Sequence, residues 1–232
     1  MGLLLYIPGF RPSLEKAFHE FKNNFISFIR FNVLFLSFCA VVSYLAALLV
    51  LSLTYDLTLA NILHLAMIIP LLSYPGAGFV YYYCCFVRGV SNTSNQIFRG
   101  YRWYFNILQF LSVLAILGVL CVYPVAELPA QNWLYRLRTI AGLMFFTWFL
   151  VRSVFTFLII VDDNSSALEA VKKSFLITRN KFYRILISMI LLIFFLISGL
   201  LLIGIGFIAT IGIYMLAYIH YYDFVRKENV NN

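Results

Sequence analysis

The sequence predicts an all-α, polytopic membrane fold with six transmembrane helices in three hairpins. Three observations lead to this prediction: 63% of the 232 residues are hydrophobic, only 11% are charged, and the apolar residues fall into long runs. Soluble domains are about 45–50% apolar and about 25% charged, so a water-soluble fold could not cover this much apolar surface. Each crossing needs roughly 20 apolar residues, so the chain is long enough for about six spans and little more. Residues 1–232 are therefore expected to form a single integral membrane domain.

Apolar runs between charged residues define the six spans. They cover Val33 to Leu53, Ile62 to Phe86, Phe105 to Tyr123, Ile140 to Val161, Ile185 to Leu202 and Phe207 to Tyr222. Only the glycines at 199, 204 and 206 separate the last two, and a single tilted or re-entrant helix is the alternative there. Two spans are favoured, because about 40 helical residues at ~1.5 Å each would be twice as long as a bilayer is thick.

Lys and Arg residues lie almost entirely on one side of these spans. Fifteen of the 17 fall on the side of the two termini and of the loops around 88–104 and 162–184, and only Arg136 and Arg138 fall on the other. Cationic residues are retained in the cytoplasm, so both termini and these two loops are predicted to be cytoplasmic. The net charge of +8 is then a topology signal and a contact surface for anionic membrane lipids, with no nucleic-acid partner expected.

A short pattern of two Phe residues around one basic residue recurs three times in these cytoplasmic segments. The triplets are Phe18, Lys22 and Phe25; Phe98, Arg102 and Phe105; and Phe175, Arg179 and Phe182. Chance predicts about 0.2 such triplets, and each one directly precedes an odd-numbered span. The chain is therefore predicted to contain three copies of one unit, at approximately 12–87, 91–161 and 163–225, each an amphipathic interfacial helix followed by a hairpin.

Helix-start residues support these interfacial helices: Ser13 in the first, Thr93 with Gln96 in the second, and Ser166 with Glu169 in the third. Residues spaced i, i+4, i+7 share a helix face, so the Phe rings would enter the acyl boundary while the cation between them reaches lipid phosphate. These helices either anchor the following span or dock a protein partner.

The stretch from Val151 to Leu186 resembles a recurring element of bacterial six-span membrane proteins. These are the families of the YciC type, of the domain-of-unknown-function 975 type and of the membrane domain attached to some glycerophosphodiester phosphodiesterases. The resembling residues are Arg152, Asp162, Asp163, Glu169, Ala170, Ser174, Leu176, Thr178, Arg179 and Asn180, and the segment Gln96 to Arg102 is similar to the entry of the third span. The resemblance implies six spans in a bacterial cytoplasmic (inner) membrane, and no catalytic domain.

Arg152 lies inside the predicted fourth span, ten residues before Asp162. On a straight helix its backbone would be about 15 Å from the cytoplasmic boundary, where an Arg costs at least ~2.5–3.5 kcal/mol and needs a partner or water. Asp162 points away on such a helix, so Asp223 in the sixth span, snorkelling, or a lipid phosphate are the candidate partners. Arg152, Asp223 and Asp162 form the candidate intramembrane polar site, which is either structural or binds substrate or lipid.

The second span carries Pro70, Pro75, Gly76 and Gly78 near its middle. Proline removes a backbone hydrogen bond, so this span is expected to be kinked or broken. A kink that lets helices pack is one interpretation, and a substrate pathway through a broken helix is the other.

No catalytic constellation is recognisable in the sequence. His19, His64 and His220 are far apart, and P-loop, nucleophile-elbow and dinucleotide-binding motifs are absent. The sequence therefore predicts no enzyme, cofactor or metal. The first functional hypothesis is a scaffold or partner subunit with a basic, lipid-contacting cytoplasmic face, and the alternative is a transporter or lipid-handling protein with a site near Arg152 and the second span.

Overall fold

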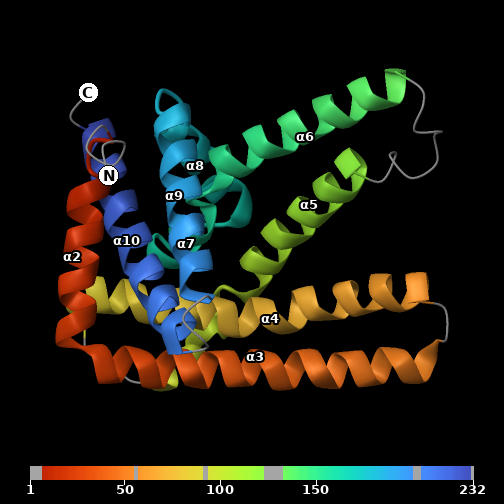
Figure 1. The fold of residues 1–232 in the computed structure, drawn as a ribbon, viewed down its shortest axis with the longest axis horizontal. Helices are drawn as coiled ribbons and strands as arrows, with labels where there is room; N and C mark the ends of the chain where they lie inside the picture. The colour runs from red at the N-terminus through yellow and green to blue at the C-terminus, as the bar shows by residue number, and fades with distance from the viewer. Residues whose placement is uncertain (1–6, 55–56, 91–93, 123–132, 201–204, 231–232) are drawn as a thin grey trace.

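The computed structural model describes residues 7–54, 57–90, 94–122, 133–200 and 205–230, and the regular elements in this part of the chain are all helical. The elements are α2 (Phe10–Asn23), α3 (Phe25–Leu53), α4 (Leu57–Val87), the 3-10 helix η1 (Ser94–Arg102), α5 (Tyr104–Val122), α6 (Trp133–Ser153), α7 (Thr156–Asp162), α8 (Ala167–Thr178), α9 (Phe182–Leu200) and α10 (Ile205–Val230). Figure 1 shows their arrangement.

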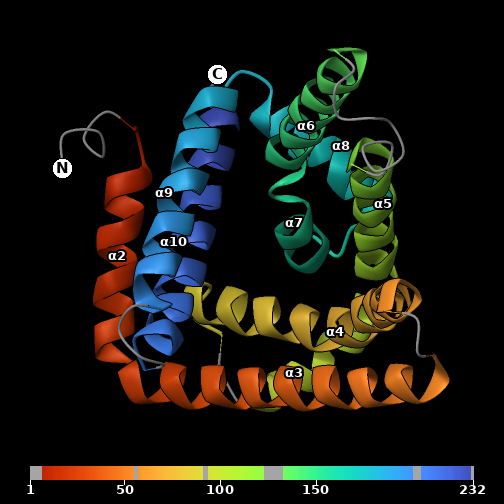
Figure 2. The same ribbon diagram turned by 45° about the vertical axis from the view of Figure 1, so that its right-hand side comes forward.

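The helices form a packed hub from which two arms project. The hub consists of α2, α7, α8, η1, α10 and the adjoining ends of α3, α4 and α9, which contact one another. One arm is the pair α3–α4 and the other is the pair α5–α6 (Figures 1 and 2). In both views α3 and α4 run crosswise to α9 and α10, so the three helix pairs do not share one direction as in a bundle of parallel spans.

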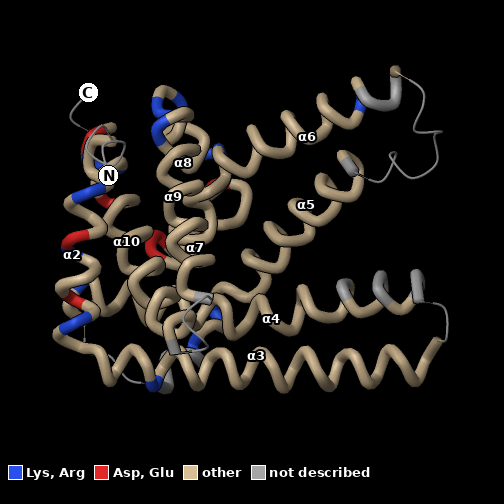
Figure 3. Tube along the Cα trace, viewed as in Figure 1, with Lys and Arg blue, Asp and Glu red and all other residues tan. Residues whose placement is uncertain are grey.

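Four helical segments of the described chain are long and apolar enough to cross a membrane. They are Phe25–Leu53, Tyr104–Cys121, Leu137–Asp162 and Phe182–Gly199. Their predicted counterparts are the first, third, fourth and fifth spans, whereas the second and sixth do not meet the same criteria within the described residues. In Figure 3 charged residues gather in the hub, and the length of α3 and α5 beyond it carries none. This arrangement is that of a helical membrane protein.

The second predicted span forms one continuous helix and is not broken. α4 runs through Pro70 and Pro75 from Leu57 to Val87. The hydroxyl of Ser73 donates to the carbonyl oxygen of Pro70 at 2.7 Å, so a side chain bonds a backbone acceptor beside the first proline. Of the two expectations for this span, the break is therefore wrong, because the helix is continuous, and the kink stays a prediction.

The predicted order of short and long helices is observed, with differences at the helix starts. α2 precedes α3, η1 precedes α5 and α8 precedes α9. The hydroxyl of Ser166 accepts from the backbone N–H of Glu169, as the capping pattern predicted. Ser13 is not a cap, because α2 already begins at Phe10 and the Ser13 hydroxyl donates to the Gly9 carbonyl. Thr93 and residues 201–204, where a turn is predicted, lie outside the described part of the chain.

Aromatic side chains fill the interface between α3 and α4, beside α10. Phe28 stacks on Tyr83 with ring centroids 5.3 Å apart, and Phe31 stacks on Tyr82. Asn32, which is fully buried beside them, accepts a hydrogen bond from the Tyr83 hydroxyl at 2.6 Å and donates to the Ile208 carbonyl at 2.8 Å. A single polar side chain thus joins three helices inside an otherwise apolar interface.

Gly100 lets η1 lie directly on α4. A Cβ atom at this position would collide with the carbonyl oxygen of Tyr74, and the Tyr74 hydroxyl donates to the Phe98 carbonyl at 2.7 Å.

We expect Gly100→Ala to lower the free energy of unfolding by about 2 kcal/mol, because backbone atoms must separate to admit the methyl group. Unfolding in detergent micelles measures this. Gly76→Ala is the control, since its Cβ would meet only Phe157 at 3.9 Å, and equal losses in both variants would contradict the prediction.

Candidate functional site

Asp162 and Asp223 come together in the hub, but around Arg88 and not around Arg152. Arg88, directly after α4, donates through Nη1 and Nη2 to both oxygens of Asp223 at 2.6 and 2.9 Å. Its Nη2 also reaches Asp162, at the end of α7, at 2.9 Å. A guanidinium has a fixed fork of donors that suits two carboxylates at once. One side chain therefore joins α4, α7 and α10.

Further charges extend this network, which we call the Arg88 cluster. Arg226 in α10 donates to Asp163 at 3.0 Å, and Lys173 in α8 approaches the same carboxylate at 3.0 Å. The cluster comprises Arg88, Asp162, Asp163, Lys173, Asp223 and Arg226. Its three cations and three carboxylates balance, and the hydrogen bonds that Arg88 donates to Asp223 raise the pKa of the Arg88 guanidinium further. The arrangement is a neutral clamp between helices.

Arg152 lies elsewhere, at the end of a helix, because the predicted fourth span is not one straight helix. α6 ends at Ser153 and α7 begins at Thr156. The carbonyl of Arg152 accepts from the hydroxyl of Ser174 at 2.7 Å, and the carbonyl of Val154 accepts from the Tyr218 hydroxyl. In a continuous helix these two carbonyl oxygens would accept from backbone N–H groups, and here hydroxyl groups of other helices bond them instead.

The break corrects two expectations about Arg152. The expected distance of about 15 Å between Arg152 and the cytoplasmic boundary assumed one straight helix, and the helix ends at Ser153. Asp223 is not the partner of Arg152, because that carboxylate binds Arg88. Instead, Nη1 of Arg152 donates to the carbonyl of Phe175 in α8 at 3.2 Å. The guanidinium also lies over the Trp148 ring, 5.7 Å from its centroid. Arg152 is therefore fixed at the junction of α6 with α8.

A groove with a volume of about 660 Å³ opens at this junction. Its lining residues are Trp148, Arg152, Val171, Lys172, Phe175, Leu176 and Arg179, and we call it the basic groove. Within the described residues, no carboxylate pairs with any of its three cations, and the buried Nε of Arg152 has no hydrogen-bond partner. Glu169, the acidic residue of α8, does not line the groove. The groove is thus cationic and partly aromatic.

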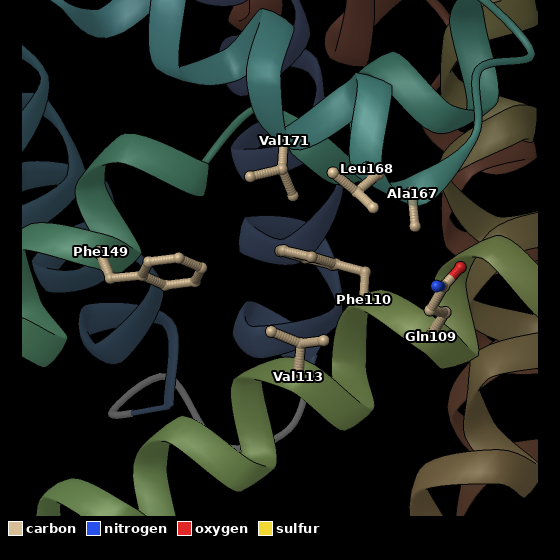
Figure 4. Close-up of a pocket in the computed structure, with 7 residues that line it drawn as sticks. All are labelled: Gln109, Phe110, Val113, Phe149, Ala167, Leu168 and Val171. Atoms are coloured by element: carbon tan, nitrogen blue, oxygen red, sulfur yellow. The ribbon is translucent and has the colours of Figure 1, made fainter.

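An apolar pocket of about 240 Å³ adjoins the basic groove and shares Val171 with it. Figure 4 shows Phe110 and Val113 of α5 facing Phe149 of α6, with Leu168 and Val171 of α8 above them. Only Gln109, at the margin of the view, brings a polar side chain to the lining. Cationic and apolar surfaces therefore meet along α8.

The three Phe-basic-Phe triplets occupy equivalent joints in the fold. The first Phe of each lies in a short helix, and the last lies in the first turn of the long helix that follows. The expected single helical face is not formed, because the short helix ends before the third residue. The basic residue is exposed in all three: Lys22, Arg102 and Arg179.

The Phe residues of the triplets differ in exposure. Phe18, Phe25, Phe98 and Phe105 are between 44% and 78% exposed, whereas Phe175 and Phe182 are half-buried. Phe175 packs edge-on against Trp148 and Phe149. Phe175 and Arg179 of the third triplet thus line the basic groove, and the exposed rings of the other two triplets remain predicted lipid contacts.

A second ion pair holds the end of α10 against α9. Glu228 accepts from Arg184, with Nη1 at 3.2 Å, and from Lys181 at 3.2 Å. The hydrogen bond from Arg184, followed by that from Lys181, lowers the pKa of Glu228 from 4.5 to about 2. The carboxylate is therefore ionised throughout the physiological range.

This shift predicts an acid-sensitive contribution to stability. A lowered pKa in the folded state stabilises the fold above pH 4.5 and does so less and less as the pH falls towards about 2. We expect the Tm difference between the wild type and Glu228→Gln to be largest above pH 4.5 and to vanish near pH 2. Thermal unfolding across this range, with the exposed Glu15→Gln as control, measures it. A difference that does not change with pH would contradict the assignment.

Sequence reasoning missed Arg88 and Arg226 as partners of the aspartates. Both lie at the cytoplasmic boundary that the sequence predicts for the ends of the second and sixth spans, as do Asp162 and Asp223. Matching each acidic residue at the predicted cytoplasmic boundary with the basic residues at the same boundary would have identified these two partners. His, Cys, Asp and Glu side chains form no group of three or more suited to a metal ion in the described parts of the chain.

Comparison of the chain with protein-family models, with curated proteins and with solved structures finds no match. The resemblance of Val151 to Leu186 to bacterial six-span families therefore stays a prediction that rests on its motifs.

Proposed function

We propose that the chain is a non-enzymatic, six-span protein of a bacterial cytoplasmic membrane, and that it acts as a scaffold or partner subunit. Both termini would be cytoplasmic, and the hub with its basic residues would contact anionic lipids. The packing of α2 against α10 supports placing both termini on the same side of the membrane. The ring centroids of Phe10 in α2 and Tyr221 in α10 are 5.8 Å apart. The lengths of α4 and α10, 31 and 26 residues, are sufficient for the second and sixth spans.

The observation that carries the proposal is the uncovered apolar face of α3. Only 11% of the residues in its most apolar stretch are buried. Val41, Tyr44, Leu45 and Leu48 follow one another at helical spacing and are between 47% and 64% exposed. In a membrane, such a face is covered by lipid or by a helix of another subunit.

Photo-crosslinking in native membranes tests the partner role. A photoreactive amino acid at Leu45 or Leu48 should give a discrete adduct with a protein of defined mass. The same amino acid at Val50, which is 2% exposed on the same helix, is the control and should give none. Adducts with lipid alone from all exposed positions of α3 would overturn the partner role.

Reporter fusions test the orientation independently. Cytoplasmic activity of a reporter fused to either end is the expected result, because the excess of Lys and Arg is predicted to stay inside. Ends that are accessible from opposite compartments would overturn the six-span topology.

Lipid handling is the second candidate function, favoured by the basic groove at Arg152 and the apolar pocket beside it. The continuous helix α4 removes the broken-helix pathway from this candidate, so the junction of α6 with α8 is what supports it.

A further inference from the structure

We infer that the basic groove and the apolar pocket together form one binding site for an anionic phospholipid, with the phosphate group at Arg152, Lys172 and Arg179 and an acyl chain in the pocket between α5, α6 and α8. The inference rests on the proposed membrane location. It deepens the proposed lipid contact by naming the lipid class and the residues that would select it.

The charge distribution of the hub argues for an anionic headgroup. The carboxylates at 15, 20, 162, 163, 223 and 228 all pair with Lys, Arg or His elsewhere. The three cations of the groove gather within two turns of α8 and the end of α6, and within the described chain none has a carboxylate partner. Such a cluster attracts a phosphate from the anionic cytoplasmic leaflet.

Arg152 is held in position before any ligand arrives. Its guanidinium lies over Trp148 and uses Nη1 to bond the Phe175 carbonyl, while its backbone carbonyl accepts from Ser174. Among the described residues its buried Nε has no partner, so the protein alone does not satisfy all donors of this guanidinium. A pre-positioned cation loses little conformational entropy on binding.

The position of the apolar pocket argues for a lipid and against a free phosphate ion. It shares Val171 with the groove, and apart from Gln109 its lining residues are apolar, among them Phe110, Val113 and Phe149. A molecule with an anionic head and an apolar chain matches both surfaces at once, since the cationic groove and the apolar pocket meet at Val171 of α8. Phosphate alone would use only the groove.

Lipid retention measured by native mass spectrometry tests the site. Detergent-solubilised full-length protein is mixed with dioleoyl-phosphatidylglycerol or with dioleoyl-phosphatidylcholine. The wild type should retain phosphatidylglycerol preferentially, and Lys172→Gln and Arg179→Gln should each weaken it about fivefold. Arg30→Gln with Lys227→Gln is the matched control, because both side chains are exposed and lie outside the groove.

A second pair of variants tests the pocket without changing charge. Val113→Phe should fill the pocket and reduce retention, whereas Val119→Phe, exposed on the same helix outside the pocket, should not. Circular dichroism and Tm of each variant show that it is folded.

Three results would overturn the inference: equal retention of phosphatidylcholine, equal losses in the groove variants and their control, or displacement of the lipid by inorganic phosphate with no effect of Val113→Phe. The last would indicate a phosphate ion site. None of these results would alter crosslinks from Leu45 or the reporter topology, so the site and the proposed function fail separately.

Discussion

Replacing Arg88 with methionine should lower the free energy of unfolding by about 3 kcal/mol. The side chains of Asp162 and Asp223 are only 15% and 21% exposed, and Arg88 forms an ion pair with each of them. Breaking a buried ion pair costs about 3–5 kcal/mol because a charge is left without compensation. The lower end of that range applies, since Arg88 is itself 36% exposed and Arg226 still reaches Asp162 at 3.4 Å.

Unfolding in detergent micelles provides the measurement, and a second substitution sharpens it. Adding Asp223→Asn to Arg88→Met should recover more than half of the loss, because it removes the unpaired charge. Arg11→Met is the matched control: its pair with Glu15 is exposed at both ends and should contribute no more than about 0.5 kcal/mol. If the double variant were less stable than Arg88→Met alone, the Arg88 cluster would not stabilise the fold through its ion pairs.

Replacing Asn32 with leucine should also lower the free energy of unfolding by about 3 kcal/mol. The substitution leaves the buried hydroxyl of Tyr83 without its acceptor and removes the side-chain donor from the carbonyl of Ile208 in α10. Each unsatisfied buried polar group costs about 1–3 kcal/mol. Tyr83 is fully buried, so water cannot replace the lost partner.

Tyr83→Phe in the Asn32→Leu background should restore part of this stability, because it removes the hydroxyl that the first substitution left unbonded. Asn23→Leu serves as the control, since its amide bonds only His19 at the exposed end of α2. Thermal and denaturant unfolding report both changes. If Asn32→Leu and Asn23→Leu had equal effects, the buried hydrogen bonds would not contribute as described.

The composition and periodicity of the chain were sufficient to predict its helical membrane character. Long apolar runs are set by local sequence, and they predicted four helices that the structure shows to be long and apolar enough to cross a membrane. The order of short amphipathic and long helices was predictable for the same reason, as was the helix start at Ser166. These features depend on residues close together in the chain.

Which charges meet was decided only by the tertiary structure. Asp162 and Asp223 were both recognised as unusual, but their shared partner Arg88 is 74 and 135 residues away in the chain. The end of α6 at Ser153 had no local signal either, because hydroxyl groups of Ser174 and Tyr218 from other helices bond the carbonyls there. A side chain that competes for a backbone acceptor from a distant helix cannot be read from the sequence around the break.

The sequence by itself thus determined that this protein is helical, apolar and basic at one set of boundaries, because burial in a bilayer demands internally bonded helices and local charge tells where they end. Only the tertiary structure decided that Arg88 joins three helices and that Arg152 faces a groove beside an apolar pocket. Contacts between distant segments depend on the path of the chain in three dimensions, which no local pattern encodes.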